Sequence, residues 1–152
     1  MAGHSGIIIE SGNTIRFDVA LRGMPVAKGR PRSTSKGRVY TPMKTRNYER
    51  DLAAVASMKM GKAPLMEGQI AINVRVYVTP PKCWSRKRKE EALAGYRRPV
   101  TRPDVDNYLK IVMDALESVV YERDSQVVTA EVSKWYAAAP QMSVLLYKVL
   151  DR

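Results

Sequence analysis

The sequence predicts a single compact domain of the α+β class, in which helices pack on a mixed β-sheet. The chain has 152 residues, of which 45% are hydrophobic, enough for one domain with a real core and too few to expect two. Apolar side chains recur at strand spacing in some segments and at helix spacing in others. The predicted order is strand, helix, strand, helix, helix, strand, strand, which lacks the regular alternation of a doubly wound fold.

The N-terminal half of the chain supplies two predicted strands with a helix between them. In residues 14–21 apolar side chains alternate with polar ones, and residues 69–78 repeat this pattern. Such alternation is typical of half-buried strands. Between the two strands, Tyr48 and Leu52 are spaced as on one face of a helix. We therefore expect a helix over residues 45–60.

The C-terminal half supplies two predicted helices followed by two strands. Residues 85–94 are compatible with a short helix, basic at its start and acidic at its end. A second helix is expected to begin at Val105, because apolar residues recur at helical spacing from there to Val120. Residues 127–136 and 142–150 are expected to form the last two strands.

The absence of a membrane-spanning stretch, together with a single histidine and a single cysteine, limits the kinds of function to be expected. Residues 1–13 are expected to form a flexible segment, so the predicted domain spans residues 14–152. No stretch approaches the roughly 18 to 20 apolar residues that cross a membrane, and no signal peptide is evident, so we expect a cytoplasmic protein. His4 lies in the terminal segment, and Cys83, the sole cysteine, cannot form an internal disulfide. Any catalysis is therefore expected to come from carboxylates.

The strongest functional signal lies at the start of the second predicted helix. Residues 102–110 read Arg-Pro-Asp-Val-Asp-Asn-Tyr-Leu-Lys. Pro103 favours an extended residue before it, which places Asp104 at or just outside the first helical turn. Asp106 lies within that turn, and Lys110 follows it by four residues, one turn further along the same face. A third acid, Asp124, stands just ahead of a β-branched run.

Three carboxylates and a lysine are sufficient for metal-dependent phosphodiester hydrolysis. Mg²⁺ prefers oxygen ligands and is usually held by one or two carboxylates together with substrate phosphate. It can polarise a phosphoryl oxygen and lower the pKa of a bound water, while a lysine adds fixed positive charge. The alternative is structural, because Asp is a common helix cap and an Asp-to-Lys pair four residues apart is a common surface pair. The strongly basic chain favours the metal site.

Basic residues outnumber acidic ones and gather in two stretches. The chain contains 26 Lys and Arg against 15 Asp and Glu, a formal net charge of +11, which favours a phosphate backbone as partner. Residues 28–46 contain no acid and are interleaved with Gly, Pro, Ser and Thr, so we expect a basic loop there. Residues 82–102 form the second stretch; merely solvated surface is the alternative for both. The residues expected to bind DNA are Lys28, Arg30, Arg32, Lys36, Arg38, Lys44, Arg86, Lys87, Arg88 and Arg102.

Several of these segments together resemble one known family. The segments are residues 102–110, Asp-Ala-Leu at 114–116 and Asp-Ser-Gln-Val-Val at 124–128. They are similar to the core motif of the RusA-type Holliday junction resolvases, small endonucleases of bacteria, prophages and phages. Pro-Val-Ala-Lys-Gly-Arg-Pro-Arg at 25–32 and Tyr-Thr-Pro at 40–42 resemble the family's basic N-terminal segment. The resemblance covers most of the chain from about residue 14 onward.

The resemblance implies a structure-selective endodeoxyribonuclease that resolves four-way DNA junctions by paired nicks, in recombination and repair or in phage DNA processing. Carried over by position, the catalytic residues are Asp104, Asp106, Lys110 and Asp124, and the three aspartates hold Mg²⁺, with Mn²⁺ as a substitute. Arg123 departs from the pattern by replacing an acid that can precede the third aspartate. Because this leaves Glu122 an uncertain substitute, we keep Glu122 outside the catalytic set.

A resolvase of this kind is expected to act as a C2 homodimer, because two symmetric nicks require two identical sites. The apolar run at residues 144–150 is one candidate for the dimer surface. Asp114 and Glu117 are expected to act as salt-bridge or supporting residues on the polar helix face. Two other functions remain open: a non-catalytic protein that binds DNA junctions, and a basic RNA-binding or structural protein in which the acids are helix caps.

Overall fold

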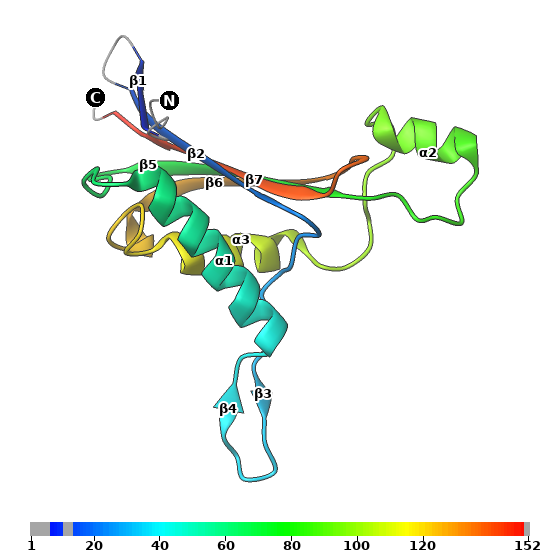
Figure 1. Ribbon diagram of the computed structural model, residues 1–152, viewed down its shortest axis with the longest axis horizontal. Helices are drawn as coiled ribbons and strands as arrows, with labels where there is room; N and C mark the ends of the chain where they lie inside the picture. The colour runs from blue at the N-terminus through cyan, green and yellow to red at the C-terminus, as the bar shows by residue number, and fades with distance from the viewer. Residues whose placement is uncertain (1–6, 11–13, 151–152) are drawn as a thin grey trace.

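The computed structural model describes residues 7–10 and 14–150, and it confirms the α+β class (Figure 1). In chain order the elements are β1 (Ile7–Glu10), β2 (Thr14–Arg22), β3 (Arg32–Ser33), β4 (Val39–Tyr40), α1 (Met43–Met60), β5 (Ile70–Val78), α2 (Arg86–Leu93), α3 (Val105–Leu116), the short 3-10 helix η1 (Asp124–Gln126), β6 (Val127–Tyr136) and β7 (Gln141–Lys148). The seven predicted elements occur in the predicted order, and the described residues add β1, the β3–β4 pair and a short 3-10 helix.

Five strands form one mixed sheet in the order β1-β2-β7-β5-β6. Neighbouring strands are antiparallel except β5 and β6, which run parallel. In the middle of the sheet Val74 of β5 pairs with Val144 of β7 and with Val132 of β6, and Val144 also pairs with Val19 of β2. This register places apolar side chains from neighbouring strands in one row on the same face.

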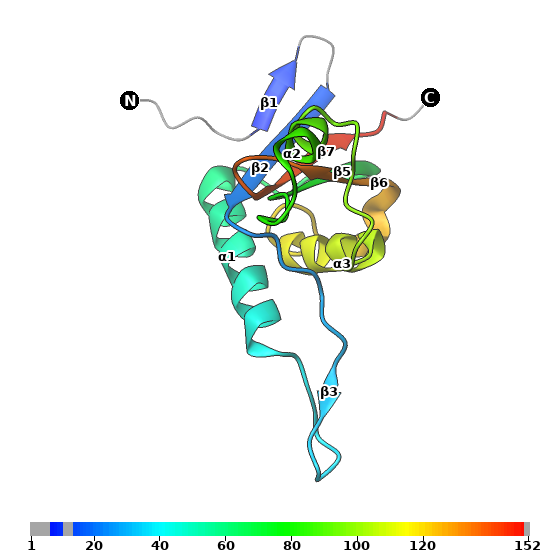
Figure 2. The ribbon, with the colours of Figure 1, turned by 90° about the vertical axis from the view of Figure 1, so that its right-hand side faces the viewer.

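The helices α1 and α3 lie side by side on that apolar face (Figure 2). Val19, Val74 and Val144 are almost completely buried beneath them. From the helices, Leu52 of α1 and Ile111 of α3 are fully buried against the sheet. The core therefore fixes the orientation of α3, whose opposite face carries the charged residues of the predicted site.

The structure places only part of the apolar run 144–150, the candidate dimer surface, in the core. Strand β7 lies in the interior of the sheet, between β2 and β5. Val144 and Leu146 are 0% exposed because they face the helices. These two residues belong to the core, whereas Tyr147 and Leu150 are exposed, so a dimer surface in this run stays a prediction.

Two parts of the chain extend away from this body. The two-stranded β3–β4 hairpin projects beyond the start of α1 in both views (Figures 1 and 2). Helix α2 stands at another side of the sheet, where Trp84 contacts Tyr136 edge to face at 5.2 Å between ring centroids. Arg98 lies 3.8 Å above the ring centroid of Trp135. These aromatic contacts hold the α2 segment against β6.

The structure differs from the sequence prediction at three places. Helix α3 ends at Leu116 rather than near Val120, because Ser118 adopts a positive φ of 65° that a helix cannot continue through. Residues 28–46 were expected to be a loop, but part of this stretch forms the β3–β4 hairpin. Residues 7–10, expected to be flexible, form β1 against β2. The remaining expectations for residues 1–6 and 11–13, including His4, lie outside the described residues.

Candidate active site on helix α3

The first turn of α3 presents two acids whose side chains are not used by the fold. Asp104 is the N-terminal cap residue, with extended backbone angles of φ −77° and ψ 157°, but its side chain makes no capping hydrogen bond. Asp106 lies in the first turn. Both residues are exposed, and no side chain of the described residues forms a hydrogen bond or ion pair with either carboxylate. The capping function considered above therefore does not occupy them.

The same face of the helix continues with a basic and an acidic residue. Lys110 and Asp114 follow Asp106 at intervals of four residues, so the three side chains project from one face. The ammonium group of Lys110 donates to Oδ1 of Asp114 over 2.9 Å. Lys110 therefore reaches toward the C-terminal half of α3 and not back to Asp106. The hydrogen bond and the negative charge of Asp114 raise the pKa of Lys110 above its ordinary value, so it stays protonated at neutral pH.

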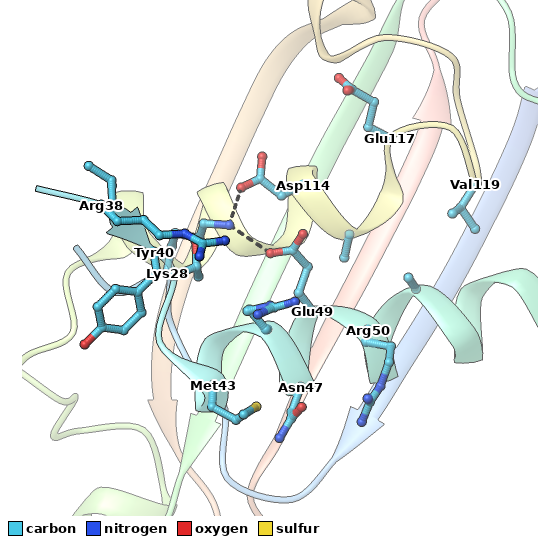
Figure 3. A pocket seen from close by; sticks show the side chains of 15 residues that line it. Lys28, Arg38, Tyr40, Met43, Asn47, Glu49, Arg50, Asp114, Glu117 and Val119 are labelled. Atoms are coloured by element: carbon cyan, nitrogen blue, oxygen red, sulfur yellow. Dashed lines mark hydrogen bonds and ion pairs between the residues drawn. The ribbon is translucent and has the colours of Figure 1, made fainter. Parts of the chain in front are cut away.

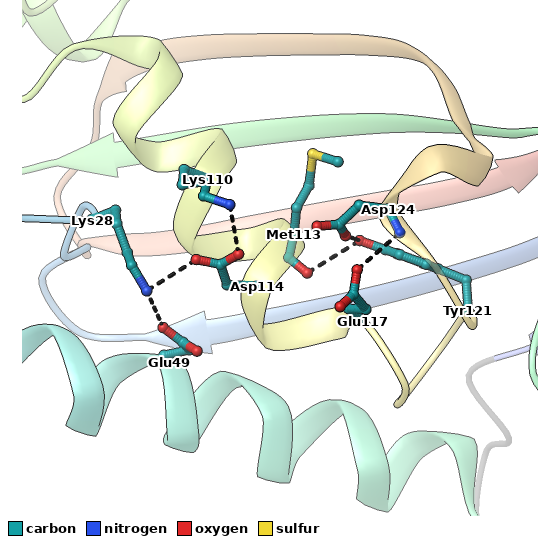
Figure 4. Close-up of polar contacts among 8 residues, drawn as sticks. All are labelled: Lys28, Glu49, Lys110, Met113, Asp114, Glu117, Tyr121 and Asp124. Carbon is teal, nitrogen blue, oxygen red and sulfur yellow. Dashed lines mark hydrogen bonds and ion pairs between the residues drawn. The ribbon is translucent and has the colours of Figure 1, made fainter. Parts of the chain in front are cut away.

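Asp114 is also bound through its other carboxylate oxygen by Lys28 (Figure 4). The Lys28 ammonium lies 2.9 Å from Oδ2 of Asp114 and 2.8 Å from Oε2 of Glu49 on α1. The backbone N–H of Lys28 donates to the carbonyl oxygen of Asn107 over 3.0 Å. Glu49, Lys28, Asp114 and Lys110 thus form a continuous chain of charges that ties α1 and the basic segment to α3.

The charges in this chain support one another. Burial disfavours the charged form of Lys28, but its hydrogen bonds to Glu49 and Asp114 outweigh that effect and raise the pKa of Lys28. Burial likewise opposes ionisation of Asp114, yet the hydrogen bonds from Lys110 and Lys28 outweigh it and lower the pKa of Asp114. Both lysines and Asp114 are therefore charged at neutral pH.

The third predicted aspartate, Asp124, begins η1 close to the C-terminal half of α3. The hydroxyl of Tyr121 donates to Oδ1 of Asp124 over 2.8 Å, and the backbone N–H of Asp124 donates to Oε2 of Glu117 over 3.0 Å. Burial raises the pKa of Asp124, and the negative charge of Glu117 adds to this, although the Tyr121 hydrogen bond opposes it. Asp124 is thus held in place and is harder to ionise than an ordinary aspartate.

The structure does not bring the three predicted metal ligands together as a closed cage. Within residues 7–10 and 14–150, no three His, Cys, Asp or Glu side chains are grouped closely enough to hold a metal among themselves. What α3 offers instead is a pair of free carboxylates, Asp104 and Asp106. Mg²⁺ commonly keeps several waters and uses one or two carboxylates plus substrate phosphate. The chemistry of this donor pair therefore fits a hard divalent cation.

Two residues that hold the side chains of the site in place, Glu49 and Tyr121, were not expected from the sequence. Glu49 lies 21 positions from Lys28, so no local spacing connects them. Tyr121 carried only a weak sequence signal, its position three residues before Asp124. The structure adds that Tyr121 is fully buried although it bears a hydroxyl. A buried hydroxyl usually has a hydrogen-bond partner, and here the partner is the predicted ligand. The salt-bridge role expected for Asp114 is present.

All but one of the residues predicted to bind DNA are exposed, and they form two groups. Arg30, Arg32, Lys36, Arg38 and Lys44 are exposed on or beside the β3–β4 hairpin, and Arg86, Lys87, Arg88 and Arg102 are exposed on or near α2 and before α3. Lys28 is the exception, because it is half-buried between two carboxylates. Beside the second group lies Trp84, with the Arg88 guanidinium 4.0 Å above its ring centroid and Tyr136 at its edge.

No helix among the described residues is both long and apolar enough to span a bilayer.

A known protein family matches the part of the chain that carries the candidate site. Residues 22–147 match the family described as endodeoxyribonuclease RusA, a range that contains the whole charged network. The chain is also 42% identical over 140 residues to the uncharacterized protein YqaN of Bacillus subtilis (strain 168), covering 89% of this chain and 96% of that protein. On this match, the chain belongs to the RusA family of Holliday junction-resolving endodeoxyribonucleases.

Proposed function

We propose that this protein is a divalent-metal-dependent endonuclease that nicks branched DNA, with four-way junctions as its main substrate. The observation that carries the proposal is the pair of exposed carboxylates, Asp104 at the N-terminal cap of α3 and Asp106 in its first turn, which no described side chain binds. Asp106 also shares a helix face with Lys110, four residues further on. Free carboxylates at the start of a helix that carries a fixed cation one turn further along, in a strongly basic chain, suit a metal ion that is shared with a phosphate.

In this mechanism Asp104 and Asp106 would hold Mg²⁺, for which Mn²⁺ could substitute, and Asp124, which the fold does not group with them, would complete the site only once metal and substrate phosphate are bound. Such an ion, when bound, would supply Lewis-acid polarisation of a phosphoryl oxygen and lower the pKa of a water. Lys110 places a permanent positive charge beside the scissile phosphate, where negative charge increases during hydrolysis. Asp114 fixes the position of that ammonium group, and Tyr121 fixes the carboxylate of Asp124.

Substrate binding is assigned to the exposed basic residues of the β3–β4 hairpin and of the α2 segment. Contacts from Arg and Lys to phosphates give affinity that depends on salt and little on sequence. Because a four-way junction must be cut twice, we propose that two copies act as a symmetric dimer, each with one site. The proposed setting is the cytoplasm, in recombination and repair or in phage DNA processing.

The test is a nicking assay on an immobile four-way junction and on a linear duplex of the same sequence, with Mg²⁺ or with chelator. The parent protein and Asp106→Asn are compared, and a gel-shift measures junction binding by both. We expect paired, metal-dependent nicks in the junction only, lost in Asp106→Asn while binding persists. Tight junction binding without cutting under any divalent ion would make the protein a non-catalytic binder, and preference for competing RNA would favour the RNA-binding alternative.

A further inference from the structure

A cleft of about 990 Å³ opens between the β3–β4 hairpin, the first half of α1 and the end of α3 (Figure 3). At the hairpin side it is lined by Arg38 and Tyr40, and α1 contributes Arg46. On the α3 side it is lined by Asp114. Positive and aromatic groups thus stand at one side of the cleft, and the carboxylate network of the candidate active site stands at the other.

The rim of this cleft exposes an unusual amount of apolar surface for a basic region. Val39 is 68% exposed, Tyr40 45% and Met43 70%. They lie beside Arg38 and Arg46, which also line the cleft. Apolar and aromatic side chains interleaved with arginines are the combination that binds unpaired nucleic acid, since bases stack on the rings while arginines contact phosphates. A purely phosphate-binding surface would need the arginines alone.

The cleft leads directly to the residues of the candidate active site. Lys28 and Asp114, joined over 2.9 Å, both line it. The second carboxylate oxygen of Asp114 binds Lys110 on the catalytic face of α3. A strand lying in the cleft would therefore have one end of its path at the hairpin and the other at the helix that carries the proposed catalytic residues.

We propose that this cleft binds an unpaired DNA strand, with Tyr40 stacking on a base and with Arg38 and Arg46 contacting phosphates. The inference rests on the proposed function only in taking DNA as the partner. In a duplex the faces of the bases are covered by their neighbours, so the exposed ring of Tyr40 has nothing to stack on. Branched DNA offers unpaired or readily unpaired nucleotides at the branch point, next to the phosphate that is to be cut.

The test measures binding in the presence of chelator, so that no strand is cut. Fluorescence anisotropy compares a labelled mixed-sequence single strand, the duplex of the same sequence and the matching RNA strand. The variants are Tyr40→Ala, Tyr40→Trp, and Tyr147→Ala as a control. Tyr147 is similarly exposed, at 40%, but alternates with buried Leu146 on β7 and so faces away from α1 and α3.

We expect Tyr40→Ala to weaken single-strand binding at least about fivefold, with duplex binding changed less than about twofold. Tyr40→Trp should retain binding, and Tyr147→Ala should bind both DNAs like the parent. Equal weakening of single strand and duplex by Tyr40→Ala, no weakening, or a preference for the RNA strand would overturn the inference. Junction nicking is measured separately, so that the two proposals can fail independently. If nicking depends on Asp106 but Tyr40→Ala leaves strand binding unchanged, the strand-binding cleft is rejected and the nuclease stands. If Tyr40→Ala weakens strand binding but no nicking depends on Asp106, the nuclease is rejected and the cleft stands.

Discussion

The two halves of helix α3 hold their acidic side chains in opposite ways. In the first turn, Asp104 and Asp106 project into solvent without a partner among the described side chains. In the second half, Asp114 is bound by two lysines from different segments, and the nearby Asp124 is held by Tyr121. One half of the helix leaves its oxygens available for a ligand, while the other half is fully engaged by the protein.

This difference separates catalysis from stability along a single helix. A carboxylate without a protein partner contributes little to folding, and its loss is felt only when a metal or substrate is present. A carboxylate shared by two ammonium groups supports both the fold and the position of those groups. Substitutions in the two halves should therefore give different combinations of lost activity and lost stability.

The largest effect is expected from the free half. Asp104→Asn should lower metal-dependent nicking by at least about 100-fold, because loss of a direct ligand should exceed the roughly 10- to 100-fold cost of losing an outer partner. Its thermal unfolding should match that of the parent, since no side-chain contact is lost. Single-turnover nicking and a melting curve provide the two measurements. A variant that melts well below the parent would show that the side chain has a structural role after all.

A substitution in the second half of α3, where the acids are bound by the protein, is expected to cause a smaller loss of activity together with a loss of stability. Asp114→Asn should lower nicking about 10- to 100-fold, because Lys110 loses the group that positions it. It should also destabilise the fold by about 1 kcal/mol, since these ion pairs are only partly buried. Chemical denaturation at neutral pH measures the second effect, with Asp51→Asn on the exposed side of α1 as a matched control.

The same variant also predicts how the stability of the fold depends on pH. The lowered pKa of Asp114 means that its ionised form stabilises the folded state. This contribution is fully present above the ordinary pKa of an aspartate and is lost as the pH falls through the lowered pKa of Asp114. The difference in unfolding free energy between the parent and Asp114→Asn should therefore be constant near neutral pH and should vanish in acid. A difference that persists below both pKa values would point to packing and not charge.

Most of the fold could be predicted because periodicity directly reports which face of an element is buried. The alternation in β2 and β5 and the helical spacing in α3 correspond to rows that meet in the core, such as Val19 and Val74. The hairpin was missed because β3 and β4 have only two residues each and every one of them is exposed, so they leave no alternation of buried and exposed positions. The true end of α3 was missed because buried Val120 continues the pattern beyond the helix.

The candidate site was predictable only where its residues are close in sequence. The spacing of Asp104, Asp106 and Lys110 on one helix follows from helical geometry alone. The ion pair that joins Lys28 to Glu49 depends on where the core places α1 against α3, which no local pattern encodes. Lys28 therefore looked like one more basic residue of an exposed loop, although the structure places it between two carboxylates.

Tyr121→Phe is expected to have a moderate effect on both measurements. It removes the hydrogen bond of 2.8 Å that holds Asp124, which should lower nicking about 10-fold, the lower end of the range for an outer partner. Loss of one buried hydrogen bond should destabilise the fold by about 1 kcal/mol. Nicking rates and denaturation curves provide the test, and Tyr108→Phe, at a buried tyrosine within α3, serves as control. Unchanged nicking by Tyr121→Phe would separate Asp124 from the catalytic set.

The smallest effect is expected for DNA binding, where an exposed lysine, Lys87, is compared with Lys28, which is bound by two carboxylates. Lys87→Gln on α2 should weaken junction binding only a few-fold and should reduce the slope of log affinity against log salt by about 0.9, the value for one lost phosphate contact. Lys28→Gln should leave that slope unchanged, because the Lys28 ammonium is already bound to Glu49 and Asp114 and releases no counterion when DNA binds. Binding measured over a range of salt concentrations distinguishes the two. An equal reduction of slope by both variants would mean that Lys28 leaves its carboxylates to contact DNA, and the engaged half of α3 would then rearrange in the complex.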